Sequence, residues 1–156
     1  MIKIESRVLG PVATNCYLII NKDNNESIVV DPADSPESIY DMVVRSASKP
    51  QAILLTHGHF DHIGAVSGLK REFQVPVYAM GAEAVVMEDS TLNLSANWAS
   101  AFTVKCDHEL ADEEKFQVAG FDIVAYHTPG HTKGGACYYI EEEQVLFSGD
   151  TIFCHS

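Results

Sequence analysis

Four side chains able to bind a metal ion lie within six consecutive residues of this chain. The segment 57–62, with the sequence HGHFDH, contains three imidazoles and one carboxylate. It directly follows the apolar run 53–55, which has the pattern of a buried strand. Packing does not require such residues there, whereas imidazole nitrogen and carboxylate oxygen suit zinc, iron or manganese. We therefore interpret this segment as part of a metal-binding site.

The spacing within this segment favours two neighbouring ions. His57 and His59 are two residues apart, so in an extended or turn conformation both side chains can face one ion. Asp61 and His62 follow at once, where the chain turns towards a helix, and form a geometrically different pair. A structural zinc site would more commonly recruit thiolates, and the four cysteines of the chain are not at finger-like spacing.

Two later segments offer further ligands. His131 lies in the segment 127–132 (HTPGHT), which follows an expected strand, and Asp150 lies in the segment 148–151 (SGDT), which follows another. Because rigid strand ends can present side chains to a common cleft, we expect the three segments to meet. His127 is expected to brace its loop rather than to bind metal.

The hydrophobic pattern predicts the elements that position these segments. Expected helices cover residues 36–48, with Ser35 as N-cap, 63–73 and 81–89. Residues 91–105 have no clear periodicity and are expected to form either a lid or a packed surface loop. Early strands separated by helices, followed by a run of strands, predict two sheets packed face to face with helices outside. The expected strands are 2–9, 15–20, 27–31, 51–55, 75–79, 115–119, 121–126, 136–141 and 145–148.

Composition limits the class of protein. With 156 residues, 46% of them apolar and 21% charged, the chain has the makeup of one folded domain. A net charge of −12 disfavours a nucleic-acid partner. The sequence has neither a signal-peptide pattern nor an apolar run that could span a bilayer, so we expect a cytoplasmic protein without a membrane partner. The cysteines lack a CxxC pair, and we expect reduced thiols, with Cys16 and Cys137 buried in strands.

The motifs also resemble those of a known family. THGHFDH at 56–62, TPGHT at 128–132 and GDT at 149–151, in this order, are similar to those of the metallo-β-lactamase superfamily. ATNCY at 13–17 and VDP at 30–32 resemble its hydroxyacylglutathione hydrolase (glyoxalase II)-like branch. The resemblance covers essentially the whole chain. It implies an α/β fold, namely an αββα sandwich of two mixed β-sheets flanked by helices, formed by a single domain over residues 1–156 that lacks the family's C-terminal strands and helices.

The resemblance also implies a set of metal ligands. By motif position, His57, His59 and His131 would hold a first ion, Asp61 and His62 would hold a second, and Asp150 would bridge both. In the family the second ion takes a further histidine beyond the GDT motif, so the second site is expected to lack one ligand here. The expected cofactors are two divalent ions, zinc first, with iron or manganese as alternatives.

This site predicts hydrolysis. Two divalent ions lower the pKa of a shared water from ~15.7 to about 7, and the resulting hydroxide can attack an ester, thioester or amide carbon. We therefore predict a metal-dependent hydrolase in which Asp61 and Asp150 are catalytic. By resemblance, its small-molecule substrate is a thioester of the hydroxyacylglutathione type.

Two alternatives stay open. The superfamily contains sulfur (persulfide) dioxygenases with one iron, which by resemblance would use His57, His131 and Asp150. The chain could also be a metal-binding or interaction fragment without turnover. In that case an exposed apolar sheet edge would favour a homo-oligomer.

Overall fold

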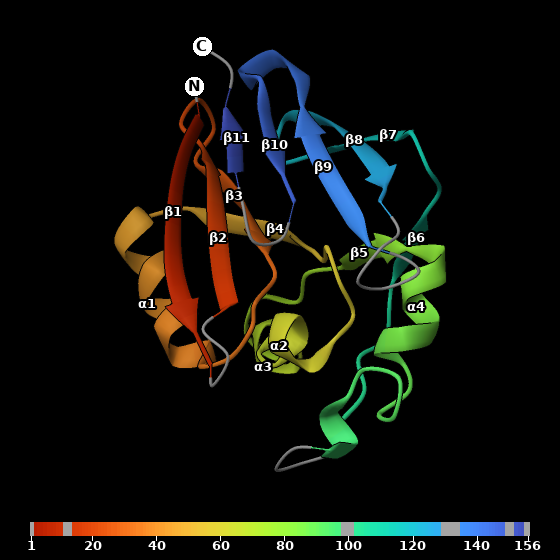
Figure 1. The fold of residues 1–156 in the computed structure, drawn as a ribbon. Helices are drawn as coiled ribbons and strands as arrows, with labels where there is room; N and C mark the ends of the chain where they lie inside the picture. The colour runs from red at the N-terminus through yellow and green to blue at the C-terminus, as the bar shows by residue number, and fades with distance from the viewer. Residues whose placement is uncertain (1, 11–13, 98–101, 129–134, 149–151, 155–156) are drawn as a thin grey trace.

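Two β-sheets packed face to face form the centre of the fold (Figure 1). The computed structural model describes residues 2–10, 14–97, 102–128, 135–148 and 152–154. Within this part of the chain, α-helices lie outside the first sheet, as the predicted α/β sandwich requires.

The first sheet combines antiparallel and parallel pairing. The first three strands pair antiparallel, and each later strand is added parallel to the one before it. Because parallel neighbours need long crossovers, helices occur in the connections. In spatial order the strands are β1 (Ile2–Leu9), β2 (Thr14–Asn21), β3 (Glu26–Val30), β4 (Lys49–Leu54), β5 (Val77–Met80) and β6 (His108–Leu110).

The second sheet is antiparallel throughout its described strands, whereas the first combines both kinds of pairing. The physical reason is connection length, since short turns can join only antiparallel neighbours. Its spatial order is β11 (Ile152–Cys154), β10 (Val145–Phe147), β9 (Ala136–Ile140), β8 (Phe121–His127) and β7 (Glu114–Val118).

Strand β2 shows why the first sheet is covered on both faces. Cys16, Leu18 and Ile20 belong to the core cluster shared with the helices, whereas Tyr17 and Ile19 belong to the cluster between the sheets. Alternate residues of a strand point to opposite faces, so a doubly covered strand is an almost continuous apolar run. The sequence of β2 has this pattern.

The connecting helices differ from the predicted ones in their ends. The structure forms α1 (Pro36–Ser46), α2 (Phe60–Ile63), α3 (Val66–Phe73), α4 (Gly81–Met87) and the 3₁₀ helices η1 (Ser95–Asn97) and η2 (Glu141–Glu143). Helix α1 ends early because Ala47 adopts a left-handed conformation, and Lys49 already starts β4. Ser35 occupies the N-cap position but makes no side-chain capping hydrogen bond. No helix in the described part of the chain is long and apolar enough to cross a membrane.

The expected helix over residues 63–73 forms only from Val66 onwards, as α3, because a break separates it from the short helix α2. Ala65 leaves the helical conformation, and its N–H donates to the carbonyl of Pro32 at 2.9 Å. The break has no space for a side chain at Gly64, since a Cβ there would lie 2.1 Å from the Ala33 carbonyl oxygen. The chain therefore turns tightly against the 32–34 segment directly after His62.

The segment 91–105 is a packed loop over its described residues. Asn93 and Ser95 are buried, and Phe102 packs against the core cluster shared with the helices. Trp98, the other aromatic residue of this segment, lies outside the described residues. The packed-loop alternative therefore fits the described part.

Candidate metal centre

Three neighbouring parallel strands end at the same edge of the first sheet, and the candidate site begins there. Strand β3 is followed by Asp31, β4 by the segment 55–62, and β5 by helix α4. Carboxyl ends of adjacent parallel strands are the usual place for a binding site in α/β sheets. This arrangement brings Asp31 and α4 to opposite sides of the HGHFDH segment.

Asp31 holds two residues of this region with one fully buried carboxylate. Its Oδ1 accepts a hydrogen bond from Thr56 N at 2.8 Å, and its Oδ2 accepts one from Thr56 Oγ1 at 2.5 Å. The same Oδ2 lies 3.0 Å from His62 Nδ1. The prediction did not include Asp31 in the site. The available signal was an acidic residue directly after an apolar strand, the same pattern that identified the other segments.

These hydrogen bonds involve Nδ1 of both His57 and His62. Thr56 Oγ1 gives its only proton to Asp31, so it accepts from His57 Nδ1, which lies 3.0 Å away. His62 Nδ1 donates to Asp31 directly. In the neutral form of both rings, Nε2 therefore carries the lone pair. A carboxylate that orients histidines in this way is typical of the surroundings of bound metals.

Asp61 and His62 lie at a spacing that suits a shared ion. Asp61 Oδ2 is 3.5 Å from His62 Nε2, and two ligands on a tetrahedral zinc are separated by roughly 3.3 Å. Thr14 Oγ1 of β2 donates to the same Asp61 oxygen at 3.2 Å. The rings of His57 and His62 lie close, with centroids 4.9 Å apart. These residue types and spacings fit a divalent cation.

The second sheet contacts the backbone directly before the HGHFDH segment. Tyr138 Oη of β9 donates to the Leu55 carbonyl at 2.6 Å, and Ala136 N donates to the Thr56 carbonyl at 2.9 Å. Thr128 N in turn donates to Gly135 O at 2.8 Å, which joins the two described residues flanking the segment 129–134. Those flanks therefore lie beside Thr56, as expected for a site formed by both sheets.

Two predicted ligands, His131 and Asp150, lie outside the described residues. Among the residues that the structure does describe, no group of three or more His, Cys, Asp or Glu side chains could hold a metal ion. The complete ligand set thus stays a prediction. His127 ends β8, where its N–H donates to Asp112 Oδ1 at 2.8 Å, and His108 is exposed in β6.

The cysteines described offer little nucleophilic chemistry. Burial raises the pKa of Cys16 far above its ordinary value, and it raises the pKa of Cys106 to about 11. Both thiols are therefore protonated near neutral pH, where the thiolate is the reactive form. Cys137 is only half-buried, so the expectation of a buried thiol is wrong there.

Replacing Tyr138 by phenylalanine tests the link between the sheets. Burial raises the pKa of this hydroxyl well above its ordinary value, so the group keeps its proton and donates to Leu55. The substitution leaves a buried carbonyl without this donor, and we expect it to lower the free energy of unfolding by about 1–3 kcal/mol. Urea denaturation measures this. Tyr139→Phe, at a half-buried position of the same strand, is the control, and equal stability of both variants would contradict the expected role of the Tyr138 hydroxyl.

The fold and the position of the site define a class of protein, and comparison with known proteins names it. The sequence profile of the metallo-beta-lactamase superfamily matches residues 9–155. The chain therefore belongs to the metallo-beta-lactamase superfamily, and by this membership it is classed as a metallo-hydrolase.

Relatives and solved structures agree with this assignment. The chain is 32% identical over 147 residues to the probable metallo-hydrolase YqgX of Bacillus subtilis, covering 93% of this chain and 69% of that relative. The crystal structure of BLEG-1, a B3 metallo-beta-lactamase, superposes with a TM-score of 0.88 at 40% identity, covering 97% of this chain and 73% of that one. TTHA1623 in a di-iron-bound form gives a TM-score of 0.79 at 31% identity, covering 97% and 74%.

One more relative bears on the predicted branch. The hydroxyacylglutathione hydrolase of Klebsiella pneumoniae is 30% identical over 139 residues, which cover 89% of this chain and 47% of that enzyme. The superfamily is thus shown, and the glyoxalase II-like branch stays a proposal.

Proposed function

We propose that residues 1–156 act as one domain that binds two divalent metal ions and hydrolyses a thioester of the hydroxyacylglutathione type. The proposed ligands are His57, His59 and His131 for one ion and Asp61 and His62 for the other, with Asp150 between them. When bound, the ions would supply Lewis acidity and an activated water. Zinc is the first expectation, and iron is the alternative that the di-iron-bound neighbour supports.

The hydrogen-bond chain from His57 through Thr56 to Asp31 carries this proposal. Together with the bond from His62 to Asp31, it places the proton of each neutral ring on Nδ1 and the lone pair on Nε2, the atom proposed to face an ion. A purely structural role for these histidines would not require both rings to be oriented from one buried carboxylate, His62 directly and His57 through Thr56. Thr14 supports the same interpretation, because its hydroxyl orients the carboxylate of Asp61.

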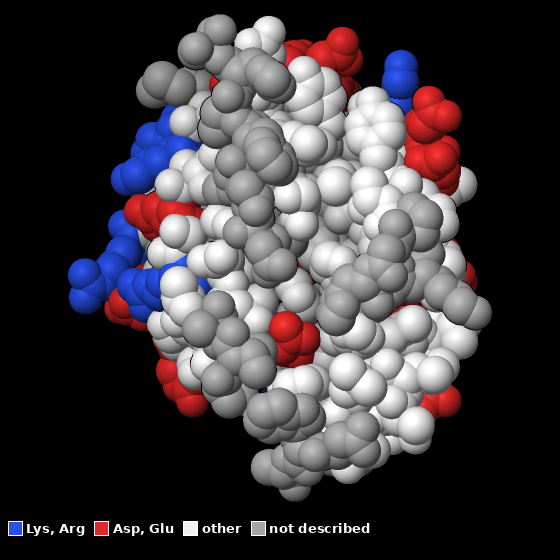
Figure 2. Space-filling model, in the orientation of Figure 1, with Lys and Arg blue, Asp and Glu red and all other residues white. Residues whose placement is uncertain are grey.

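Charge supports a small-molecule partner. Figure 2 shows most of the visible Lys and Arg side chains along one side of the face, over β1 and α1, with acidic side chains among them. Arg7 and Arg45 on that side both pair with Asp41, at 2.9 and 3.0 Å. These cations are therefore partly neutralised, which disfavours a polyanionic partner such as nucleic acid.

The proposal is tested by metal analysis and substrate turnover of the purified chain. We expect two equivalents of zinc or iron, hydrolysis of S-lactoylglutathione, loss of activity with a chelator, and recovery when zinc is restored. One equivalent of iron, with oxygen consumption on glutathione persulfide, would instead identify a sulfur dioxygenase.

A β-lactam is the second candidate substrate. The similarity to BLEG-1, at 40% identity over nearly the whole chain, favours it. A chromogenic cephalosporin should therefore be assayed in parallel with the thioester. Turnover of the cephalosporin without turnover of the thioester would replace the proposed substrate and leave the hydrolytic class intact.

A further inference from the structure

Glu83 on helix α4 is a fully buried carboxylate that the proposed chemistry does not use. Buried carboxylates are rare unless they are paired or hydrogen bonded, because removing the charge from water is costly. Glu83 Oε1 accepts a hydrogen bond from Gly58 N at 2.5 Å. Gly58 lies between His57 and His59, so this contact reaches the centre of the predicted ligand pair for the first ion.

The segment that follows α4 holds the backbone on the other side of His59. Phe60 N donates to the carbonyl of Asn93 at 2.8 Å. Asn93 is itself fully buried, and its side-chain amide donates to the carbonyls of Met87 and Phe102. The amides directly before and after His59 are therefore both bound by the segment from α4 to residue 93.

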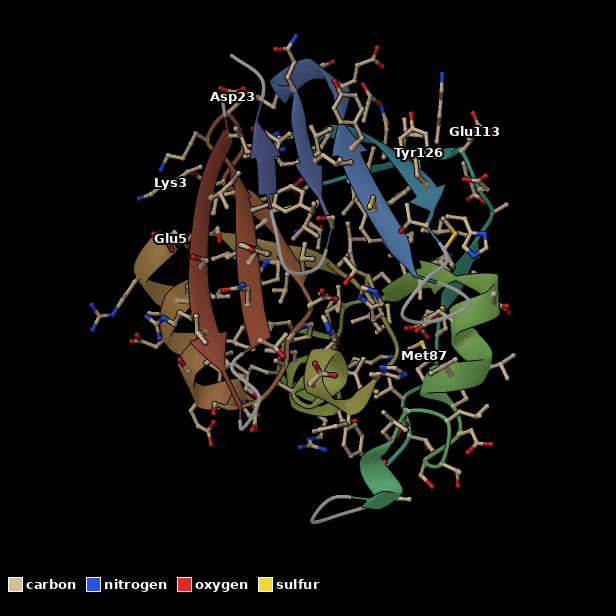
Figure 3. All side chains as sticks on the ribbon, viewed as in Figure 1. Lys3, Glu5, Asp23, Met87, Glu113 and Tyr126 are labelled. Carbon is tan, nitrogen blue, oxygen red and sulfur yellow. The ribbon has the colours of Figure 1, made fainter. Side chains whose placement is uncertain are left out.

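Close packing shows that the loop lies directly on α4. A Cβ at position 58 would lie 3.1 Å from Met87 N and 3.2 Å from Glu83 O, both backbone atoms. Figure 3 shows Met87 on the side of α4 that faces the middle of the molecule. Position 58 can approach the helix this closely because glycine has no side chain. The contact between Gly58 and Glu83 thus belongs to a tightly packed interface.

We propose that Glu83 is a positioning residue that sets the directions of the His57 and His59 side chains for metal binding by holding Gly58 N–H. The inference rests on the proposed metal site and extends it to a residue that is no ligand. A hydrogen bond to a charged acceptor is about twice as strong as a neutral one, so a carboxylate fixes the loop more firmly than an amide. Ligands held in place before the ion arrives do not pay the ordering cost on binding.

The test compares Glu83→Gln with the wild-type chain. Gln is similar in size and removes the charge. In the metal-free proteins, we expect the Gly58 amide proton resonance to move upfield in the variant, because its hydrogen bond weakens. On titration with cobalt(II), we expect at least tenfold weaker binding and an altered visible absorption spectrum, since the ligand geometry changes.

Two control variants separate positioning from general damage. Glu88→Gln makes the same chemical change at an exposed position beside α4 and is expected to leave both readouts unchanged. Val43→Ala removes buried volume from α1, away from the loop, and is expected to lower stability while keeping the cobalt spectrum. If Glu83→Gln does not fold, Glu83→Asp keeps the charge, shortens the side chain and is expected to shift the Gly58 resonance in the same way.

The outcomes for the inference and for the proposed function are distinct. A wild-type chain that binds no cobalt would overturn the proposed function, and the Gly58 resonance would still decide whether Glu83 holds the loop. A Glu83→Gln variant with the wild-type resonance and spectrum would overturn the inference. The inference would also be overturned if Glu83→Gln lost no more cobalt affinity than a Val43→Ala variant of equal stability.

Discussion

Replacing Asp31 by asparagine is expected to weaken metal binding by the chain about 10- to 100-fold. The carboxylate accepts hydrogen bonds from Thr56 and His62 and, through Thr56, determines the tautomer of a neutral His57. An asparagine amide would place a donor where one of these acceptors is needed. Asp31 has a φ of 51°, which asparagine tolerates better than most residues, so the backbone should persist.

Competition with a chromophoric chelator measures the affinity, and urea denaturation of the metal-free chain measures stability. We expect the metal-free Asp31→Asn variant to lose about 1–3 kcal/mol, because buried donors lose their acceptor. Asp122→Asn is the control, since Asp122 is exposed and its Oδ1 accepts from Gln117 at 2.6 Å, a contact that asparagine can keep. Unchanged affinity in Asp31→Asn would show that the imidazoles do not depend on this carboxylate.

Replacing Gly64 by alanine is expected to lower the free energy of unfolding by about 3 kcal/mol, because the new methyl group overlaps a neighbouring backbone. The ideal Cβ would lie 2.1 Å from the carbonyl oxygen of Ala33, a distance that no side-chain rotation can relieve. The chain must move either the 32–34 segment or the break between α2 and α3. Both adjoin the candidate site, so metal affinity should fall as well.

Gly81→Ala is the matched control for this substitution. At position 81 a Cβ would meet a flexible atom, Glu109 Oε1, at 3.3 Å, and we expect a change in stability within about 0.5 kcal/mol. Chemical denaturation of both variants gives the comparison. A Gly64→Ala variant as stable as the wild-type chain would contradict the close approach of Gly64 to the Ala33 carbonyl.

The sequence predicts the long elements of this fold well, because their signals are strong. Strands such as β2 and β8 are long apolar runs next to polar turns, and the structure confirms them within one or two residues. The short strands β6 and β11 were not predicted. Three residues carry too little periodicity to indicate a strand, and such strands depend on pairing with a neighbour that is already in place.

The segments of the candidate site could be predicted, but their surroundings could not. The HGHFDH segment can be recognised from its residue types alone, and the structure places it after the carboxyl end of β4. Asp31 bonds to Thr56, directly before that segment, and Glu83 bonds to Gly58 within it. Each carboxylate lies 25 residues along the chain from the residue it holds. A lone acidic residue after a strand or in a helix is common, and only the tertiary contacts distinguish these two.

The contacts of β9 with the 55–56 backbone affect the order in which the site can mature during synthesis. A nascent chain that has reached residue 135 contains the whole HGHFDH segment but none of β9 (Ala136–Ile140). The carbonyls of Leu55 and Thr56 then lack the hydrogen bonds from Tyr138 and Ala136. Contacts that are distant in sequence form late, so the loop reaches its final shape only after the ribosome has added the second half of the sandwich.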